Sequence, residues 1–282
     1  MKLLVLNSNN YVAGSNNKFA YNFPNFAQFK QGDKLAVLHW SMYNSIFNVT
    51  SANNNNVFQV KLNFATPVTL TITLPDGFYS VDDINSYVEQ QMLLGKYYVI
   101  NSSCENVYFF SMATNSVYYT VNVVTDVIPT SAQATTLGYT QPSGATWSYP
   151  TTASTTQIIL SANAFGALIG YNVSQTLPAT PQTTAQIYNS DVTPNIQPVN
   201  SLILRCNLVS SSYSIPVDIL HSKTIDVGIG ELMTSEPAFP IFLDISPQSF
   251  NQLLITVVDQ SFNNVNIVDT VGFLLTLAIQ TN

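Results

Sequence analysis

The stretch QLLITVVD at residues 252–259 has the composition of a buried β-strand: it is apolar, rich in β-branched residues and without helical spacing. Turn-forming Ser, Pro, Asn and Asp residues separate it from similar runs in the last third of the chain. These runs are SLILRCNLV at residues 201–209, FPIFLDI at 239–245 and GFLLTLAIQ at 272–280. The C-terminal third therefore predicts an antiparallel, all-β block.

The N-terminal part of the chain follows the same pattern. Asn- and Gly-rich connections separate short apolar runs, and we expect strands at residues 2–6, 18–23, 35–41, 57–62 and 68–74. Because strands occupy both ends of the chain without alternating helices, a doubly wound α/β fold is excluded. A sandwich in which the first and last strands share a sheet is the simplest arrangement.

One helix is predicted at residues 80–93. It follows the turn sequence Leu-Pro-Asp-Gly at residues 74–77, and Ser80 with Asp83 three residues later fits a capping box. Apolar residues recur on one face, and Gly95 ends the pattern. The stretches 125–156 and 175–198 are rich in Thr, Ser and Pro and predict ordered loops or poor strands, with a strand and a helical turn between them at residues 158–169.

The composition points to a folded protein whose surface is polar but nearly uncharged. Only 8% of the 282 residues are charged, whereas 46% are hydrophobic and 12% aromatic, which excludes a disordered chain. A charge-poor exterior suits a surface that neighbouring subunits cover, although secreted β-sandwiches are also rich in Thr, Ser and Asn. The net charge of −7 argues against a nucleic-acid partner. We expect no membrane span and no secretory signal.

The residues that most often carry chemistry are few and scattered. His39 and His221 lie in apolar, strand-like contexts, so we expect both to be structural. Cys104 and Cys206 lack CxxC or CxxH spacing, which predicts free, buried thiols, although a disulfide between them is geometrically possible. The sequence therefore predicts no metal site and no cofactor.

Two further patterns invite a catalytic interpretation and do not support it. Asp82 and Asp83 are adjacent, so a helix points them in different directions and they cannot act on one substrate. The segment Gly228-Ile229-Gly230 has no following Lys and no βα unit, so we interpret it as a turn and not as a phosphate loop. The sequons at Asn48, Asn101 and Asn172 are expected by chance in a chain this rich in Asn, Ser and Thr. We therefore expect that the protein is not an enzyme.

Long stretches of the chain resemble the minor capsid, or penton, proteins of virophages and polinton-like viruses. The resemblance lies in LVLNSNNYVAGSNNKFAYNF, LAVLHWSMYNSIFNV and LTITLPDGFYSVDDINSYV of the first half, and in NSLILRCNLVSSSYSIPVDILHS and FNQLLITVVDQSFNNVNIVD of the second. It is a similarity of pattern over most of the chain and contains no short diagnostic motif. The family has no catalytic residues to transfer, and its subunit contacts are not defined by a motif.

The resemblance implies an all-β fold: a single jelly roll, with an inserted, mostly β outer domain that carries the helix. On this basis we expect the jelly roll at residues 1–77 and 188–282 and the insertion at residues 78–187. The implied function is a structural one, as a homopentameric penton at the fivefold vertices of an icosahedral shell of double jelly-roll major capsid protein. The protein would then be made in the host cytoplasm and located in the virion.

The alternative function is a carbohydrate- or receptor-binding β-sandwich, such as a lectin or an attachment-fibre head. Tyr139, Trp147 and Tyr149 lie among Thr and Ser residues and would suit sugar stacking if they were exposed. Packing within their own loop is the other interpretation of these aromatic residues. A pentamer in solution would favour the capsid protein, whereas a monomer or trimer would favour the alternative.

Overall fold

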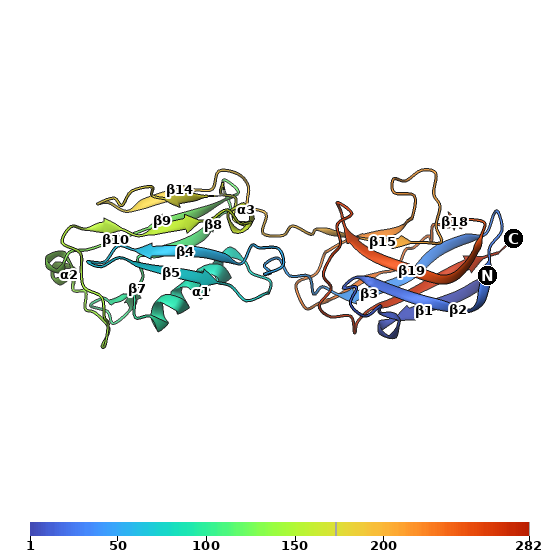
Figure 1. The fold of residues 1–282 in the computed structure, drawn as a ribbon, viewed down its shortest axis with the longest axis horizontal. Coiled ribbons are helices and arrows are strands. Elements are labelled where there is room, and N and C mark those ends of the chain that lie inside the picture. Colours follow the sequence, from blue (N-terminus) through green and yellow to red (C-terminus); the bar gives the residue numbers. More distant parts are fainter. Residues whose placement is uncertain (173, 282) are drawn as a thin grey trace. The chain divides into compact units, whose positions relative to one another are not determined.

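A computed structural model describes residues 1–172 and 174–281, and it divides the chain into two compact units (Figure 1). The first unit combines Met1–Phe47 with Gln197–Asn282, and the second is the continuous segment Asn48–Ile196. The second unit is therefore inserted into the chain of the first.

The first unit is a sandwich of two antiparallel sheets. In one sheet the strand order is β1-β20-β3-β17, with the short β18 also paired to β3, and in the other it is β16-β15-β19-β2. The strands are β1 (Lys2–Asn7), β2 (Lys18–Gln28), β3 (Lys34–Tyr43), β15 (Ser201–Cys206), β16 (Ile219–Thr224), β17 (Leu232–Ser235), β18 (Leu243–Asp244), β19 (Ser249–Asp259) and β20 (Leu274–Gln280), and a 3₁₀ turn spans Ser8–Asn10. The expected pairing of the first and last strands is confirmed, since β1 lies beside β20.

The path of the chain through these two sheets defines a jelly roll. Strands β1, β2, β3 and β15 alternate between the sheets, β16 stays in the sheet of β15, and β17, β19 and β20 alternate again. This connection of eight strands into two four-stranded sheets is the jelly-roll topology. The predicted fold class, an all-β jelly roll with a mostly β insertion, is thus confirmed, and the insertion lies between β3 and β15.

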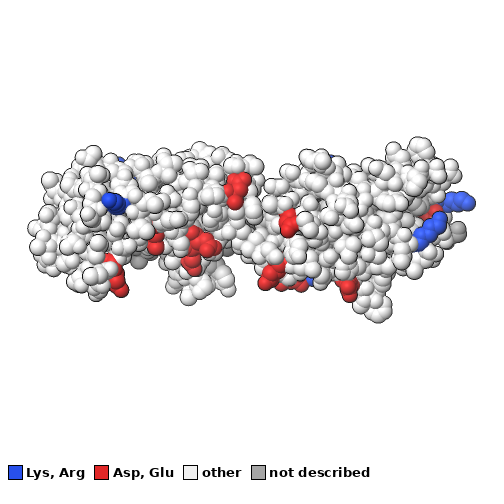
Figure 2. Space-filling model, turned by 90° about the horizontal axis from the view of Figure 1, so that it is seen from below, with Lys and Arg blue, Asp and Glu red and all other residues white. Residues whose placement is uncertain are grey.

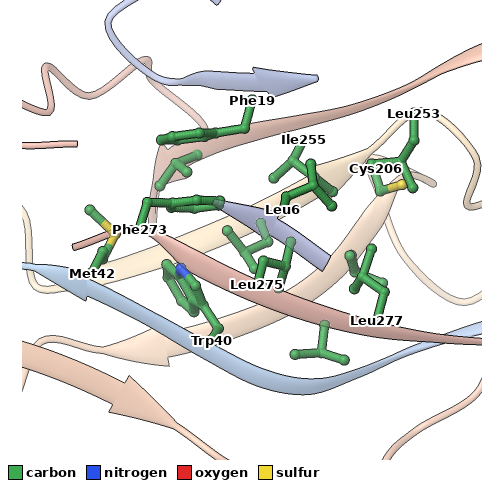
Figure 3. Close-up of a cluster of buried hydrophobic side chains, with 14 of the residues drawn as sticks. Leu6, Phe19, Trp40, Met42, Cys206, Leu253, Ile255, Phe273, Leu275 and Leu277 are labelled. Atoms are coloured by element: carbon green, nitrogen blue, oxygen red, sulfur yellow. The ribbon is translucent and has the colours of Figure 1, made fainter. Parts of the chain in front are cut away.

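Apolar side chains from both sheets fill the space between them (Figure 3). The ring of Phe19 on β2 stacks on that of Phe273, just before β20, with centroids 3.5 Å apart and planes 5° apart. Alternate residues of β20, among them Leu275 and Leu277, are fully buried, as the two-residue period of a strand requires. This core joins the first and last parts of the sequence.

The second unit contains two further antiparallel sheets and its own core. The sheet orders are β13-β12-β4-β5 and β14-β9-β8, and two short pairs, β6-β7 and β10-β11, complete the unit. Its elements are β4 (Val57–Leu62), β5 (Val68–Thr73), α1 (Val81–Leu94), β6 (Val99–Ile100), β7 (Asn106–Val107), β8 (Phe110–Asn115), β9 (Thr120–Thr125), β10 (Val127–Ile128), α2 (Ser131–Leu137), β11 (Ser154–Thr155), β12 (Gln157–Leu160), α3 (Phe165–Leu168), β13 (Gln175–Leu177) and β14 (Gln186–Asn189).

Helix α1 has the capping box that the sequence predicts. Ser80 Oγ accepts a hydrogen bond from the Asp83 backbone N–H (3.1 Å), and the Asp83 carboxylate accepts one from the Ser80 N–H (2.8 Å). Gly95 caps the other end. The buried face of the helix contributes Val81, Ile84, Val88 and Met92 to the core. Helix α3 is the helical turn expected within residues 158–169, whereas α2 lies in a stretch expected to form loops or poor strands. None of the helices in the described residues meets the length and apolarity of a membrane span.

The division of the chain differs from the expected boundaries at residues 77/78 and 187/188. Strands β4 and β5, which we expected in the jelly roll, pair with each other, and Ile158 of β12 lies opposite Val60 of β4. Residues 48–77 therefore belong to the inserted unit. At the other end, β14 pairs with β9, and the inserted unit continues to Ile196. Alternation within a strand shows that one face is buried but does not show in which core, so the boundary could not be read from the pattern.

Asn48 fastens the two ends of the inserted unit to each other. Its side-chain amide donates to the backbone carbonyls of Tyr79 (2.7 Å) and Ile196 (2.8 Å), and its Oδ1 accepts from the Tyr79 N–H (2.8 Å). The residue is 2% exposed, so this sequon lies inside the folded unit. A buried amide with three backbone partners holds the first and last residues of the unit in a fixed relation.

Replacing Ile84 by Asp should destabilise the inserted unit by about 3 kcal/mol or more, because a carboxylate would enter a core that offers it no partner. Ile84 is fully buried. The chain has two tryptophans, and a Trp40→Phe background leaves Trp147 as a fluorescent reporter within the inserted unit. Denaturant unfolding followed by this fluorescence measures the loss. Ser86→Asp on the exposed face of α1 is the control, and equal stability of both variants would contradict the packing of the helix.

Replacing Asn48 by Ala should also destabilise the inserted unit, by about 3 kcal/mol in the same fluorescence assay. Three backbone groups lose a buried hydrogen bond, at roughly 1 kcal/mol each. Asn53→Ala, at an exposed position of the following turn, should leave the midpoint unchanged. A midpoint for Asn48→Ala within error of that control would show that the two ends are held by other contacts.

Candidate functional site: two assembly surfaces

The two histidines lie in the jelly roll and have separate local partners. His39 Nδ1 on β3 is 2.9 Å from the Glu236 carboxylate, and His221 Nε2 on β16 is 2.9 Å from the Ser235 hydroxyl. The His221 ring also meets Trp40 edge to face. Within residues 1–172 and 174–281, no three His, Cys, Asp or Glu side chains form a group that could hold a metal ion. Each histidine thus contacts a polar side chain of the segment 235–236.

The two cysteines are free thiols in different environments. Cys206 is buried in the jelly-roll core, and burial raises the pKa of its thiol to about 12. Cys104 is exposed and has a φ of 63°, so the expectation of a buried thiol is wrong for this residue. The disulfide that the sequence left open between them is not formed.

The acidic pair and the glycine segment also have structural roles. Asp83 is the capping residue of α1, and its hydrogen bonds with Ser80 lower the pKa of its carboxyl, while Asp82 is exposed. The segment Gly228–Gly230 forms a turn before β17, in which the Glu231 carboxylate accepts from the Gly228 N–H and the Gly230 N–H donates to the Asn44 carbonyl. The turn interpretation agrees with this geometry.

The aromatic residues considered for sugar stacking belong to the core of the inserted unit. Trp147 is 7% exposed, its indole stacks on Phe64 with centroids 4.2 Å apart, and its Nε1–H donates to the Lys96 carbonyl (2.6 Å). Tyr149 meets Trp147 edge to face, and Tyr139 is half-buried against the same core. The stretch 125–156 is therefore part of a packed unit, and these residues form no exposed platform.

Charged residues are sparse on the surface. The chain has 8 Lys and Arg and 15 Asp and Glu residues, and Figure 2 shows a face on which isolated charges are separated by wide uncharged areas. On such a surface the exposed apolar side chains are the groups that gain most from contact with another protein. In the jelly roll, two groups of them are considered as contact surfaces, and others, such as Phe26 and Val271, lie outside both groups.

The first group, which we call the loop surface, lies on the connections β15–β16 and β17–β18. Tyr213 and Ile215 are 102% and 92% exposed, and Phe239 and Ile241 are 87% and 75% exposed. Val217 is exposed beside them in sequence. Single exposed apolar residues are ordinary, but five large ones on two loops are not.

The loop surface exists because residues 236–242 leave the sheet. The β17–β3 register ends with Ser235 opposite Trp40, and the β18–β3 register begins with Leu243 opposite Leu35. The seven residues 236–242 thus lie opposite only four residues of β3, 36–39, so they form a loop, and Phe239 is an exposed residue of this loop. The predicted strand at residues 239–245 is for this reason wrong over most of its length. Pro237 and Pro240, which cannot donate ladder hydrogen bonds, were the signal against it.

A groove of about 290 Å³ opens between these loops. Residues of β16, the two loops, β3 and β18 line it, among them Val37, His221, Phe239 and Ile241. Burial, with a smaller contribution from the nearby Lys223 charge, lowers the pKa of His221. The shift favours the uncharged imidazole, in a groove whose lining combines apolar side chains with Ser211, Ser214 and Ser222.

The second group, which we call the edge-strand surface, lies on the outer face of β1. The inward residues Leu4 and Leu6 are buried, whereas Leu3 and Val5 between them are exposed, as is Met1. Strand β1 is at the end of its sheet order, so this strand is apolar on both faces and lies at an edge. Such an edge strand promotes association with another chain unless it is protected.

No family model matches the chain, and no curated protein matches it. Among solved structures, it is similar to the crystal structure of the selenomethionine-labelled mavirus penton protein. The similarity covers 100% of this chain and 99% of that chain, with 10% sequence identity and a TM-score of 0.42.

The half-buried His221 should make the jelly roll less stable in mild acid. Because its pKa is lower in the folded protein than the ordinary value near 6.5, the unfolded chain binds the proton first as the pH falls through that value. Stability should therefore be constant above about pH 7 and fall from about pH 6.5 downward. Thermal unfolding of wild type and His221→Gln between pH 8 and pH 5 measures this effect. The melting temperature of the variant should fall less below pH 6.5 than that of wild type. Equal falls in both proteins would contradict a role of His221 in the pH dependence.

Proposed function

We propose that this protein is a structural protein of a viral capsid. It would assemble into homopentamers and occupy the fivefold vertices as a penton, surrounded by double jelly-roll major capsid protein. In this role it would be made in the host cytoplasm and be located in the virion. The proposal names no catalytic residue, metal or cofactor.

The observation that carries this proposal is the pair of apolar surfaces on a jelly roll whose exterior has few charges. A ring closed by rotation needs two different surfaces on each subunit, because every contact is head to tail. Removing water from such surfaces costs least where few charged groups must be desolvated. The loop surface and the edge-strand surface meet both requirements.

The inserted unit is the outer domain in this proposal. It joins the jelly roll through the connections before Asn48 and after Ile196, and its β8–β9 turn exposes Val117, Tyr118 and Tyr119 to more than 70% each. An exposed tip of this kind offers aromatic rings for contact with a host surface. A receptor-binding role of the inserted unit is therefore compatible with a capsid role of the jelly roll.

The carbohydrate-binding alternative loses the residues that first favoured it, because Trp147 and its neighbours are packed within the core. It would now require another site, and the β8–β9 tip is the candidate. Glycan binding by a monomer would be the result that restores this alternative as the main function.

The proposal predicts that the purified protein forms pentamers and enters fivefold vertices. Light scattering should give about five times the monomer mass of 30.9 kDa. Particles assembled from this protein and a double jelly-roll major capsid protein should show density for this protein at the vertices in electron micrographs. Particles assembled from the major capsid protein alone are the control, and their vertices should be empty. Monomers at assembly concentrations, with empty vertices in both preparations, would overturn the capsid function.

A further inference from the structure

We propose that the loop surface of one subunit packs on the edge-strand surface of the next copy, and that this contact closes the ring. The inference rests on the proposed pentamer and identifies its interface. The loop surface is Tyr213, Ile215, Val217, Phe239 and Ile241, and the edge-strand surface is Met1, Leu3 and Val5. The occupant of each surface is therefore a second copy of this chain.

The two surfaces lie at opposite edges of one sheet. In the order β1-β20-β3-β17, strand β1 is at one end, while β17 and β18, which flank residues 236–242, are at the other side of β3. With neighbouring strands about 4.8 Å apart, the edges are separated by roughly 14 Å. Two different surfaces at opposite edges suit head-to-tail contacts around a ring, in which each subunit uses one surface toward each neighbour.

The strand register places the surfaces at the same height along the sheet. Lys2 on β1 is opposite Ile279 on β20, Ile279 is opposite Leu35 on β3, and Leu35 is opposite Leu243 on β18. Leu3 and Ile241 are thus each close to one row that crosses the whole sheet. Rotation about an axis along the strands keeps this height, so one subunit's loop surface comes level with the next subunit's edge strand.

The charges beside the two surfaces are complementary. Glu236 and Asp244 flank the residues of the β17–β18 loop; they contact His39 (2.9 Å) and Lys34 (3.9 Å), and their side chains are still 74% and 70% exposed. Lys2 lies next to Leu3 on the edge strand. Opposite charges at the margin of an apolar contact favour the correct partner orientation.

The exposed apolar side chains supply part of the area that a specific contact needs. At roughly 150 Å² for one large side chain, their exposed fractions correspond to about 600 Å² on the loop surface and about 300 Å² on the edge-strand surface. A standard interface buries about 800 Å² on each partner. The backbone and the polar neighbours of both surfaces would supply the remainder.

The test uses one charge on each surface of the full-length protein. Phe239→Asp and Leu3→Asp should each weaken the contact by about 100-fold or more, because the carboxylate would be buried without a partner. Both variants should be monomers where wild type is pentameric. Val271→Asp is the matched control, since Val271 is an exposed apolar residue of the β19–β20 connection outside both surfaces. Thermal unfolding of all three variants shows that they remain folded.

Mixing the two monomeric variants identifies the head-to-tail arrangement. The Leu3→Asp protein keeps its loop surface and the Phe239→Asp protein keeps its edge strand, so one intact contact remains and a 1:1 dimer should form. A contact of identical surfaces would leave one of the two variants fully assembled by itself. That result would overturn the pairing.

Cross-linking provides the second, independent measurement. In a Cys104→Ser background, the double variant Leu3→Cys with Ile241→Cys should give covalent oligomers of up to five chains under oxidation, and each single variant should give none. If wild type forms pentamers but neither Asp variant dissociates and no ladder appears, the proposed interface is wrong and the capsid function stands. Wild type that stays monomeric overturns both.

Discussion

The jelly roll depends on one strand, β20, which lies between β1 and β3 and pairs with both, from Leu274 to Ile279 with β1 and from Leu274 to Gln280 with β3. Its inward residues meet the opposite sheet, where Phe273 stacks on Phe19. The two inner strands of this sheet thus come from distant parts of the sequence, β3 from its first fifth and β20 from its last residues. The position of β1 at the edge of this sheet, with its outer face exposed, follows from that closure.

Much of the jelly roll can be predicted from alternation alone. The runs at residues 2–6, 18–23, 35–41 and 272–280 become β1, β2, β3 and β20 with small changes at their ends, and the capping box of α1 is visible in the sequence. The expected number of about eight jelly-roll strands is also found, but some of these strands are not the ones that the sequence predicts. Strands β4 and β5 belong to the inserted unit, while β16 and β17, which are short and partly polar, replace them.

The candidate surfaces were harder to predict, for a physical reason. Buried strands and exposed assembly surfaces have the same apolar composition, so FPIFLDI at residues 239–245 looks like a core strand although Phe239 and Ile241 face solvent. The reverse holds for Trp147, whose Thr- and Ser-rich neighbours suggest exposure although its indole is buried. Sequence pattern reports which residues avoid water, whereas only the fold shows whether their own chain covers them.

The hydrogen bonds of Asn48 bear on how the chain can fold. The inserted unit is a continuous segment with its own core, so it can form while the C-terminal strands of the jelly roll are still being synthesised. Once Asn48 and Ile196 are joined, the connection from β3 to β15 is effectively a short loop. Closing a loop of roughly ten residues in place of about 150 lowers the entropic cost by about 2 kcal/mol. A large insertion in the middle of a jelly roll thus adds little to the entropy that the outer strands must overcome.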